Sequence, residues 1–478
     1  MNRALTFEGT ALLGKRFALR TVLSRLSVLS LAALLVGCAS TNDGEMGAGG
    51  SVGQGGTGLP AAGATSSGTG GVSVAGGTNA GTGGVSAGTG GAIAGTAGSS
   101  SVQGGSGGTS QTGGSGGVAG GGGGGAADAG GATGGAGGGT SGECKPPTSY
   151  ANLFVTVSGK TQAESDQKLA TAWSSLFNPG GAGTIYFNGP GANESYVEDI
   201  LNNDVRTEGM SYGMMVAVQL DHQTEFDRIW SWVKNHMANG TGEIRWSCKT
   251  SGSGCAGGGA PDGEEYMATA LIFASHRWGD STGSAKIAYS TEAKWVLDLI
   301  RTKYFNSQYH LIKFVANSSN VDPSYVLPSF YEVWACFDTQ NAAFWKDAAT
   351  AGRQYMQKVV DSNGVCPYQA SFTATNPQAA NADSTRCVVN LMMDWYMFGK
   401  DAWQKDTYAP KFAAYASSRN NGGAAVGCNS TLGFGLPAAT GKPFVDKLWS
   451  LSVPSANYWD GVLYMLGMLH VSGNFHIW

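Results

Sequence analysis

Three acidic residues stand where strongly apolar helical patterns begin: Glu208, Asp262 and Asp383. A carboxylic acid and a carboxylate that face each other can act as a general acid and a general base. The simpler interpretation is that each residue caps its helix or favours the positive end of the helix dipole. Because a closed ring of helices would gather helix starts at one rim, both interpretations stay open at this point.

The stretch that follows Glu208 has apolar side chains at helical spacing: Met210, Met214, Met215 and Val218. Thr207 or Ser211 is expected to cap this helix. Gly209 and Gly213 leave room for a bulky group close to the backbone. The pattern therefore predicts a buried helix with an acidic residue at its mouth.

The region from 144 to 478 is rich in further helical patterns and has one strand-like run, Thr184–Phe187. Without fixed-period repeats, these helices predict an all-α domain with one large core, either an array or a closed toroid. The predicted helices are Ser165–Phe177, Gly209–Gln219, Glu225–Met237, Glu264–Arg277, Thr291–Arg301, Tyr325–Phe337, Ala343–Val360, Ser384–Phe398, Lys405–Tyr415 and Tyr458–Val471.

The N-terminus has the pattern of a secretory signal, in which basic residues precede a short apolar run, Leu26–Val36. This run is too short to span a bilayer comfortably. The sequence Leu35-Val36-Gly37-Cys38 resembles a bacterial lipobox, which predicts a lipoprotein signal peptide over 1–37 and lipidation of Cys38. A plain secretory signal is the alternative. Ala39 is not the aspartate typical of inner-membrane retention, so the outer membrane or cell surface is expected, with release from the cell left open.

The stretch from 38 to 143 is almost wholly Gly, Ala, Ser and Thr. Such a composition cannot bury enough apolar surface to offset its ordering entropy, so it predicts a disordered tether. A flexible coil of this length has an end-to-end distance of about 50–60 Å. Collagen is excluded because glycine does not recur at every third position with proline. A glycine-rich structural role is the alternative.

The net charge and the cysteines bear on nucleic-acid binding, disulfides and zinc sites. The net charge of −4 gives no indication of a nucleic-acid partner. A secreted context permits disulfides, and Cys248 and Cys255, which flank a Gly/Ser loop, are the expected pair. Setting Cys38 aside, the remaining count is odd, so at least one thiol is free. None of the cysteine spacings is typical of zinc.

Several separated stretches, in the right order, resemble glycoside hydrolase family 8. The first is Thr-Glu-Gly-Met-Ser-Tyr-Gly-Met-Met at 207–215, which resembles the general-acid motif of that family. The others include Trp-Ser-Cys at 246–248, Pro-Asp-Gly-Glu-Glu-Tyr at 261–266, Asp-Pro-Ser-Tyr at 322–325, and Ala-Asp-Ser-Thr-Arg at 382–386. The resemblance runs from about residue 169 to 478. It implies an (α/α)6 barrel whose cleft lies at one end of the inner helices, and a catalytic domain over 144–478.

The resemblance also implies an inverting mechanism that needs no metal and no organic cofactor. Asp262→Asn is then expected to shift the acidic limb or the optimum of the pH profile and to slow turnover. The implied roles are Glu208 as general acid, Asp383 as general base, Asp262 as the residue that holds a distorted sugar, Trp246 as its stacking partner, Tyr325 as a positioner of water, and Arg386 as a substrate-side arginine beside the base.

The motifs look closest to the xylan-acting members, so the substrate expected is a β-1,4-linked polysaccharide or oligosaccharide. Exo-acting members carry a Leu-His-Pro kink in a late loop, and the corresponding segment, Val426–Gly435, lacks it. The prediction is therefore an endo-β-1,4-xylanase. The alternatives are a reducing-end xylose-releasing exo-oligoxylanase, and an endo-β-1,4-glucanase or chitosanase of the same family. Two other classes stay open: an inactive, surface-tethered glycan-binding protein and a helical scaffold with no carbohydrate role.

Overall fold

The computed structural model describes residues 150–238, 242–419, 422–455 and 457–478. The predicted signal peptide (1–37), Cys38 and the predicted tether (38–143) lie outside these residues. None of the helices within the described ranges is long and apolar enough to cross a membrane.

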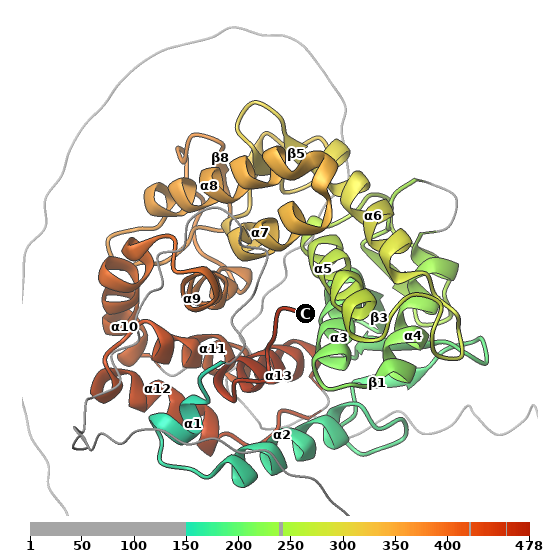
Figure 1. Cartoon of the computed structure of the whole chain (residues 1–478), viewed down its shortest axis with the longest axis horizontal. Coiled ribbons are helices and arrows are strands. Elements are labelled where there is room, and N and C mark those ends of the chain that lie inside the picture. Colours follow the sequence, from blue (N-terminus) through green and yellow to red (C-terminus); the bar gives the residue numbers. More distant parts are fainter. Residues whose placement is uncertain (1–149, 239–241, 420–421, 456) are drawn as a thin grey trace, which may run out of the picture. The chain divides into compact units, whose positions relative to one another are not determined.

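Twelve helices form two concentric rings, with each outer helix packed on an inner one (Figure 1). Each inner helix contacts the next and the last contacts the first, so the ring closes as the predicted (α/α)6 barrel. The inner helices are α3 (Thr207–Gln219), α5 (Pro261–Arg277), α7 (Pro328–Phe337), α9 (Arg386–Phe398), α11 (Gly423–Asn429) and α13 (Tyr458–Val471). The outer helices are α2 (Gln162–Leu176), α4 (Gln223–Trp232), α6 (Tyr289–Leu299), α8 (Ala342–Val359), α10 (Ala409–Ser417) and α12 (Ala438–Ser450), and the short α1 (Leu153–Thr156) packs on α2 and α12.

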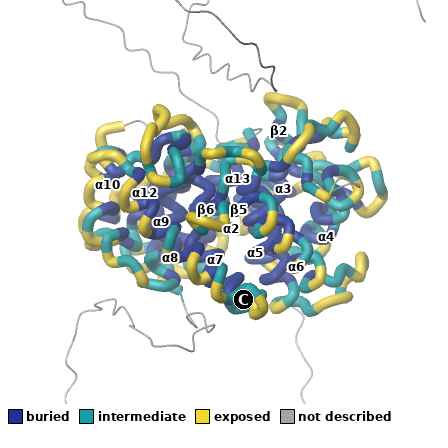
Figure 2. The backbone as a smooth tube through the Cα atoms, turned by 90° about the horizontal axis from the view of Figure 1, so that it is seen from above, coloured by how far each residue is buried: buried dark blue, intermediate teal, exposed yellow. Residues whose placement is uncertain are grey.

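The two rings differ in the pattern of their apolar residues. Inner helices are apolar around most of their circumference, and every residue of α3 except Glu208 is buried. Outer helices bury one stripe, as α4 does with Phe226, Ile229 and Trp230. The buried backbone in Figure 2 accordingly follows the inner helices.

Short sheets and single turns fill the connections, so the prediction of helices without a sheet was incomplete. A four-stranded antiparallel sheet is formed by β1 (Tyr186–Asn188), β2 (Ser195–Asp199), β3 (Asp204–Arg206) and β4 (Ser247–Lys249). The two-stranded sheets pair β5 (Phe305–Asn306) with β6 (Leu311–Ile312), and β7 (Asn320–Val321) with β8 (Ala370–Ser371). The π-helical turns are η1 (Val233–Met237), η2 (Ile300–Tyr304) and η6 (Gln404–Tyr408), and the 3₁₀ turns are η3 (Pro323–Tyr325), η4 (Thr339–Asn341), η5 (Asp383–Thr385) and η7 (Ser430–Phe434).

Helices α11 and α12 are absent from the sequence-based prediction. Helix α11 spans only seven residues and is rich in glycine and alanine, so it carries no helical period. Helix α12 contains Pro443, which reads as a helix breaker in a sequence. The closing of the ring around these helices shows that tertiary packing overrode weak local signals.

The predicted disulfide between Cys248 and Cys255 is present. A second disulfide joins Cys366 to Cys387, in the first turn of α9, and Cys336 is disulfide-bonded as well. Cys428 is a buried free thiol, which confirms that at least one cysteine is unpaired.

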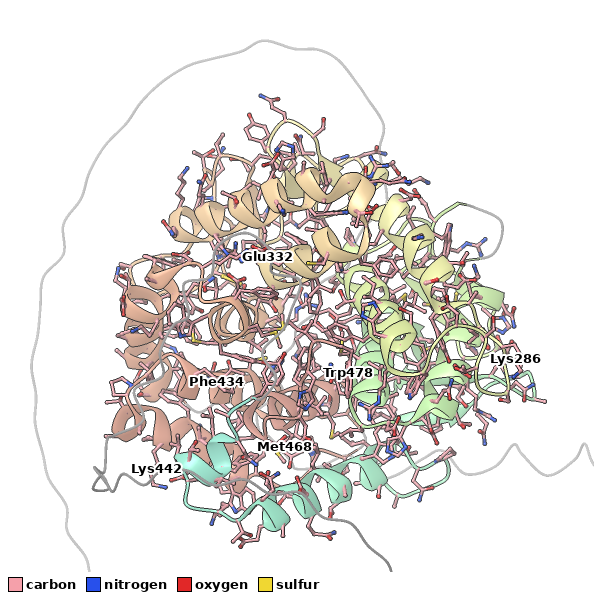
Figure 3. The ribbon with its side chains drawn as sticks, in the orientation of Figure 1. Lys286, Glu332, Phe434, Lys442, Met468 and Trp478 are labelled. Carbon is pink, nitrogen blue, oxygen red and sulfur yellow. A yellow bond between two sulfur atoms is a disulfide. The ribbon has the colours of Figure 1, made fainter. Side chains whose placement is uncertain are left out.

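The C-terminal tail packs against the end of the ring where the inner helices finish. The Trp478 indole donates a hydrogen bond to Gln219, at the end of α3, and its ring lies 4.2 Å from the guanidinium of Arg277, at the end of α5. Figures 1 and 2 place the C-terminus near the middle of the ring, on the side away from β2, and Figure 3 labels Trp478 there. The opposite end of the ring, where the inner helices begin, is the end that holds the three acids.

Candidate active site

One guanidinium gathers the three predicted acids. Nη1 of Arg386, the first residue of α9, donates to Glu208 Oε2 and to Asp262 Oδ2, both at 2.7 Å. Asp383 Oδ1 lies 3.8 Å from Nη2 of the same side chain. The Arg386 side chain is only 3% exposed, so these contacts are largely shielded from solvent.

Backbone pairing, rather than a side-chain cap, fixes the start of α3. Arg206 is the N-cap residue and makes no side-chain capping bond, so the predicted caps were wrong. The N–H of Thr207 donates to the carbonyl of Trp246, continuing the pairing of β3 with β4. Ser211 donates back to the Glu208 carbonyl inside the helix. Glu208 therefore lies two residues beyond the end of β3, in the first turn of α3.

Asp262 likewise is not a cap, because Ala260 is the N-cap residue of α5. Its Oδ1 accepts from the N–H of Gly263 and its Oδ2 from Arg386. A Cβ at Gly263 would lie 2.5 Å from the Cβ of Thr207, so glycine is what lets α5 approach the start of α3. Glu265 makes no capping box with Asp262, since its Oε1 accepts a hydrogen bond from Tyr331.

Asp383 begins the 3₁₀ turn η5, just before α9, and it does not cap that turn. Its carboxylate accepts from Asn381 at 3.0 Å. At 33% exposure it is the most accessible of the three acids, compared with 14% for Glu208 and 6% for Asp262. Of the three, Asp383 is therefore best placed to meet water.

Tyr458, the first residue of α13, holds the second oxygen of the glutamate. Its hydroxyl lies 2.7 Å from Glu208 Oε1. A Cβ at Gly209 would lie 3.2 Å from the Tyr458 ring, which confirms that Gly209 admits a bulky neighbour. The sequence analysis missed this contact, although an adjacent aromatic pair, Tyr458 and Trp459, at the start of an apolar helix could have signalled it.

Tyr325 and Trp459 flank the arginine. Their ring centres lie 5.5 and 5.4 Å from the guanidinium carbon of Arg386. Trp246 is half-buried rather than part of the core, and its ring lies 5.6 Å from the guanidinium carbon of Arg206. The structure thus brings four of the predicted site residues together around the fifth, Arg386, and places Trp246 beside the start of α3.

The electrostatics of the site keep a proton on the glutamate. Burial raises the pKa of Glu208 to about 8, against the lowering effect of Arg386, and the charges of Asp262 and Asp383 raise it further. Burial also raises the pKa of Asp262, again opposed by Arg386. A largely buried acid with a raised pKa and a more exposed acid therefore face one site, an arrangement that general acid–base chemistry can use.

Residues 193–473 match the family profile described as glycosyl hydrolases family 8. The reducing end xylose-releasing exo-oligoxylanase of Halalkalibacterium halodurans is 35% identical over 69% of this chain and 94% of its own length. The exo-oligoxylanase Rex8A of Paenibacillus barcinonensis is 34% identical over 69% of this chain and 97% of its own. Endoglucanase A of Acetivibrio thermocellus is 28% identical over 61% of this chain and 67% of its own.

Solved structures agree with these matches. A crystal structure of a reducing end xylose-releasing exo-oligoxylanase superposes with a TM-score of 0.64 at 35% identity, covering 69% of this chain and 96% of the other. The closed double ring, the match of the family profile and relatives covered over nearly their whole length point to one conclusion. The chain belongs to glycosyl hydrolase family 8.

Proposed function

We propose that this hydrolase cleaves β-1,4-xylosidic bonds in xylo-oligosaccharides and releases xylose from the reducing end. The observation that carries the proposal is that a largely buried Glu208 and a more accessible Asp383 lie on one guanidinium. The substrate class is supported by the exo-oligoxylanase relatives, one of which was solved in complex with xylobiose.

In this mechanism Glu208 is the general acid. Because arginine can only donate, Oε2 accepts from Arg386, and the acidic proton is carried on Oε1. The Tyr458 hydroxyl lies 2.7 Å from Oε1, so it can donate to the ionised glutamate and turn to accept a hydrogen bond from the Oε1 hydroxyl of the protonated one. Protonation of the glycosidic oxygen would then proceed from Oε1, with Arg386 stabilising the carboxylate that remains.

Asp383 is the general base that activates water, and Tyr325 helps to position that water. Since both carboxylates contact the same guanidinium, at 2.7 and 3.8 Å, their nearest oxygens are no more than about 9 Å apart. An inverting pair needs roughly 6.5–9.5 Å, which leaves space for a water molecule beneath the sugar. Asp262 would hold the distorted sugar at the cleavage point and Trp246 would stack on it.

The sequence analysis preferred endo-action because the segment 426–435 lacks Leu-His-Pro. The conformation of this segment gives that argument little weight. This segment, which was compared with the late loop of exo-acting members, is helical. It comprises the end of α11, the turn η7 and Gly435. Residues 426–432 are buried within the fold, so the absence of Leu-His-Pro from this segment says little about the cleft. The endo-β-1,4-xylanase therefore becomes the second candidate, and an endoglucanase activity the third, supported by the 28% identical relatives.

Xylohexaose labelled at its reducing end tests these candidates directly. Early appearance of labelled xylose together with unlabelled xylopentaose supports exo-action, whereas early xylobiose to xylotetraose would establish the endo-xylanase. Absence of cleavage would direct the test to cello-oligosaccharides and chitosan. Asp383→Asn separates the binding-protein alternative, because a binder keeps its function whereas a hydrolase loses turnover and still holds its substrate.

We also infer a surface lipoprotein that is anchored through Cys38 and carries its catalytic domain on the tether 38–143. The support is the lipobox-like sequence and the composition of the segment that follows it. Metabolic labelling with a fatty acid and membrane fractionation test this inference. Cys38→Ser should abolish the label and move the enzyme to the soluble fraction; an unlabelled wild-type protein would contradict the anchor.

A further inference from the structure

Asp322 is a fully buried carboxylate behind the site that none of the roles above uses. It is the N-cap residue of η3, and its Oδ1 accepts from the backbone N–H of Ser324 at 2.9 Å and from the Ser324 hydroxyl at 2.8 Å. The same hydroxyl lies 3.0 Å from Nη2 of Arg386. Two short contacts thus join a buried acid to the arginine that gathers Glu208, Asp262 and Asp383.

The direction of these hydrogen bonds follows from the groups themselves. A guanidinium has no acceptor, so the Ser324 oxygen must accept from Arg386. The single hydroxyl hydrogen of Ser324 is then left for Asp322 Oδ1. Asp322 therefore decides which way the serine hydroxyl points and keeps its lone pairs facing the arginine.

The hydrogen bond between Ser324 and Arg386 restrains Nη2, whereas Glu208 and Asp262 hold Nη1. Asp383 lies 3.8 Å from Nη2, too far for a hydrogen bond. Within the described residues, Ser324 is the hydrogen-bonding partner of Nη2. The Ser324 carbonyl also accepts from Asn390, one turn along α9 from Arg386. Turn η3 and helix α9 are thus locked together at two points.

We propose that Asp322 is a positioning residue that acts through Ser324 to hold the Arg386 guanidinium against the acid and the sugar-binding aspartate. This proposal rests on the proposed hydrolysis, because Asp322 and Ser324 would act on the site that carries it out. Only the acceptor Oδ1 is needed, whether or not the carboxyl is ionised.

The surroundings of Asp322 agree with this role. Its Oδ2 is buried and has no hydrogen-bonding partner among the described residues. Burial raises its pKa to about 8, against the lowering effect of Arg386 and with a raising effect from Asp383. The other titratable groups that face it are the hydroxyls of Tyr325, Tyr355 and Tyr368. A proton on Oδ2 leaves Oδ1 free to accept, and an asparagine amide would present the same acceptor.

The test uses the full chain and whichever β-1,4-linked oligosaccharide the wild type hydrolyses. Ser324→Ala and Asp322→Ala should each lower kcat by about tenfold to a hundredfold, the range for a lost hydrogen bond to a charged group. Asp322→Asn should stay within about threefold of the wild type, because it keeps the acceptor. The double variant Asp322→Ala/Ser324→Ala should lose no more than the worse single variant, since both act on one contact.

A role in stability alone would not move the pH profile. Because Arg386 lowers the pKa of Glu208, a loosened arginine should move the alkaline limb of kcat/KM to higher pH in Ser324→Ala. Asp361→Ala is the matched control: this aspartate also accepts from the N–H two residues on, but in an exposed turn away from the site, and the limb should not move.

Four results would overturn the proposal: full activity in Ser324→Ala, an unmoved limb in that variant, losses in Asp322→Asn as large as in Asp322→Ala, or losses that multiply in the double variant. If Asp322→Ala does not fold, Ser324→Ala and Asp322→Asn carry the test. A crystal structure of Ser324→Ala should show Arg386 displaced from Glu208, which is independent of turnover. Failure of the wild type on xylohexaose would contradict the substrate and leave this test intact on another glycan.

Discussion

Two buried arginines of the barrel, one on an outer helix and one on an inner helix, have opposite surroundings. Arg353, on α8, donates two bonds to Asp394 at 2.8 and 2.7 Å and a third to Glu332 at 2.8 Å. Lys400 adds a second contact to Glu332 (labelled in Figure 3), so two positive charges meet two negative ones. Arg386, by contrast, is one positive charge among the acids Glu208, Asp262, Asp322 and Asp383, and its Nε has no partner among the described residues.

The pKa values record this difference. Burial raises the pKa of Glu332, but Lys400 and Arg353 outweigh burial and leave it lowered. The pKa of Glu208 is raised instead, because one arginine cannot compensate burial and several neighbouring acids. We call the group around Arg353 the balanced cluster and the group around Arg386 the unbalanced cluster. The balanced cluster is expected to hold helices together, whereas the unbalanced cluster is expected to keep a proton available for transfer. Helix α9 contributes to both, with Arg386 at its first residue and Asp394 two turns later.

The largest expected effect is catalytic. Glu208→Gln should lower kcat by about 10²–10⁴-fold, because it removes the proton donor, while leaving the Tm unchanged or slightly raised. The control is Glu164→Gln in the exposed capping box of α2, which should leave kcat unchanged. Steady-state kinetics and thermal unfolding measure kcat and Tm of the two variants. A large drop in Tm for Glu208→Gln would mean that the cluster around Arg386 stabilises the fold, as the cluster around Arg353 does.

The balanced cluster should fail in stability instead. Arg353→Met leaves Asp394 and Glu332 buried without their partner and should cost about 3–5 kcal/mol of the free energy of unfolding. The kcat of the folded fraction should be unchanged. Lys442→Met, in an exposed pair with Asp446, is the control and should cost about 0.5 kcal/mol or less in the same urea titration. A comparable loss of unfolding free energy in Arg353→Met and Lys442→Met would contradict a stabilising role for the cluster around Arg353.

The unbalanced cluster should also show itself in the pH profile. As the proposed general acid, Glu208 is needed in its protonated form, so activity should be lost as pH rises through its pKa. The effect is then expected on the alkaline limb and the optimum, whereas the sequence analysis expected it on the acidic limb or the optimum. The charge of Asp262 raises this pKa. Asp262→Asn should therefore move the alkaline limb of kcat/KM to lower pH and slow turnover. An unmoved limb at full activity would remove Asp262 from the mechanism.

The smallest effect is expected at the rim of the balanced cluster. Lys400 is 46% exposed, so solvent screens its pair with Glu332, which retains Arg353 as a partner. Lys400→Ala should cost about 0.5 kcal/mol in urea unfolding and leave kcat unchanged. A loss close to that of Arg353→Met would mean that the cluster depends on charge balance more than on burial.

The sequence predicted most inner helices, the disulfide between Cys248 and Cys255, and the acids at the helix starts. Its main errors were local: the caps proposed for Thr207 and Ser211 do not form, because strand pairing already uses the N–H at the start of α3. The endo-acting preference rested on treating 426–435 as a loop, whereas the helix there has too little periodicity to be recognised.

The sequence by itself determined which residues could do chemistry, because helical period and family-like motifs are local properties of the chain. Tertiary structure alone decided that they lie together: Arg386 contacts Glu208 across 178 residues and Asp262 across 124. It also decided that the pKa of Glu208 is raised, since burial and the neighbouring charges are set by the packing of α3, α5, α9 and α13. The contacts of Tyr458 and Ser324 belong to the same class, because no local pattern encodes a hydrogen bond between distant helix starts.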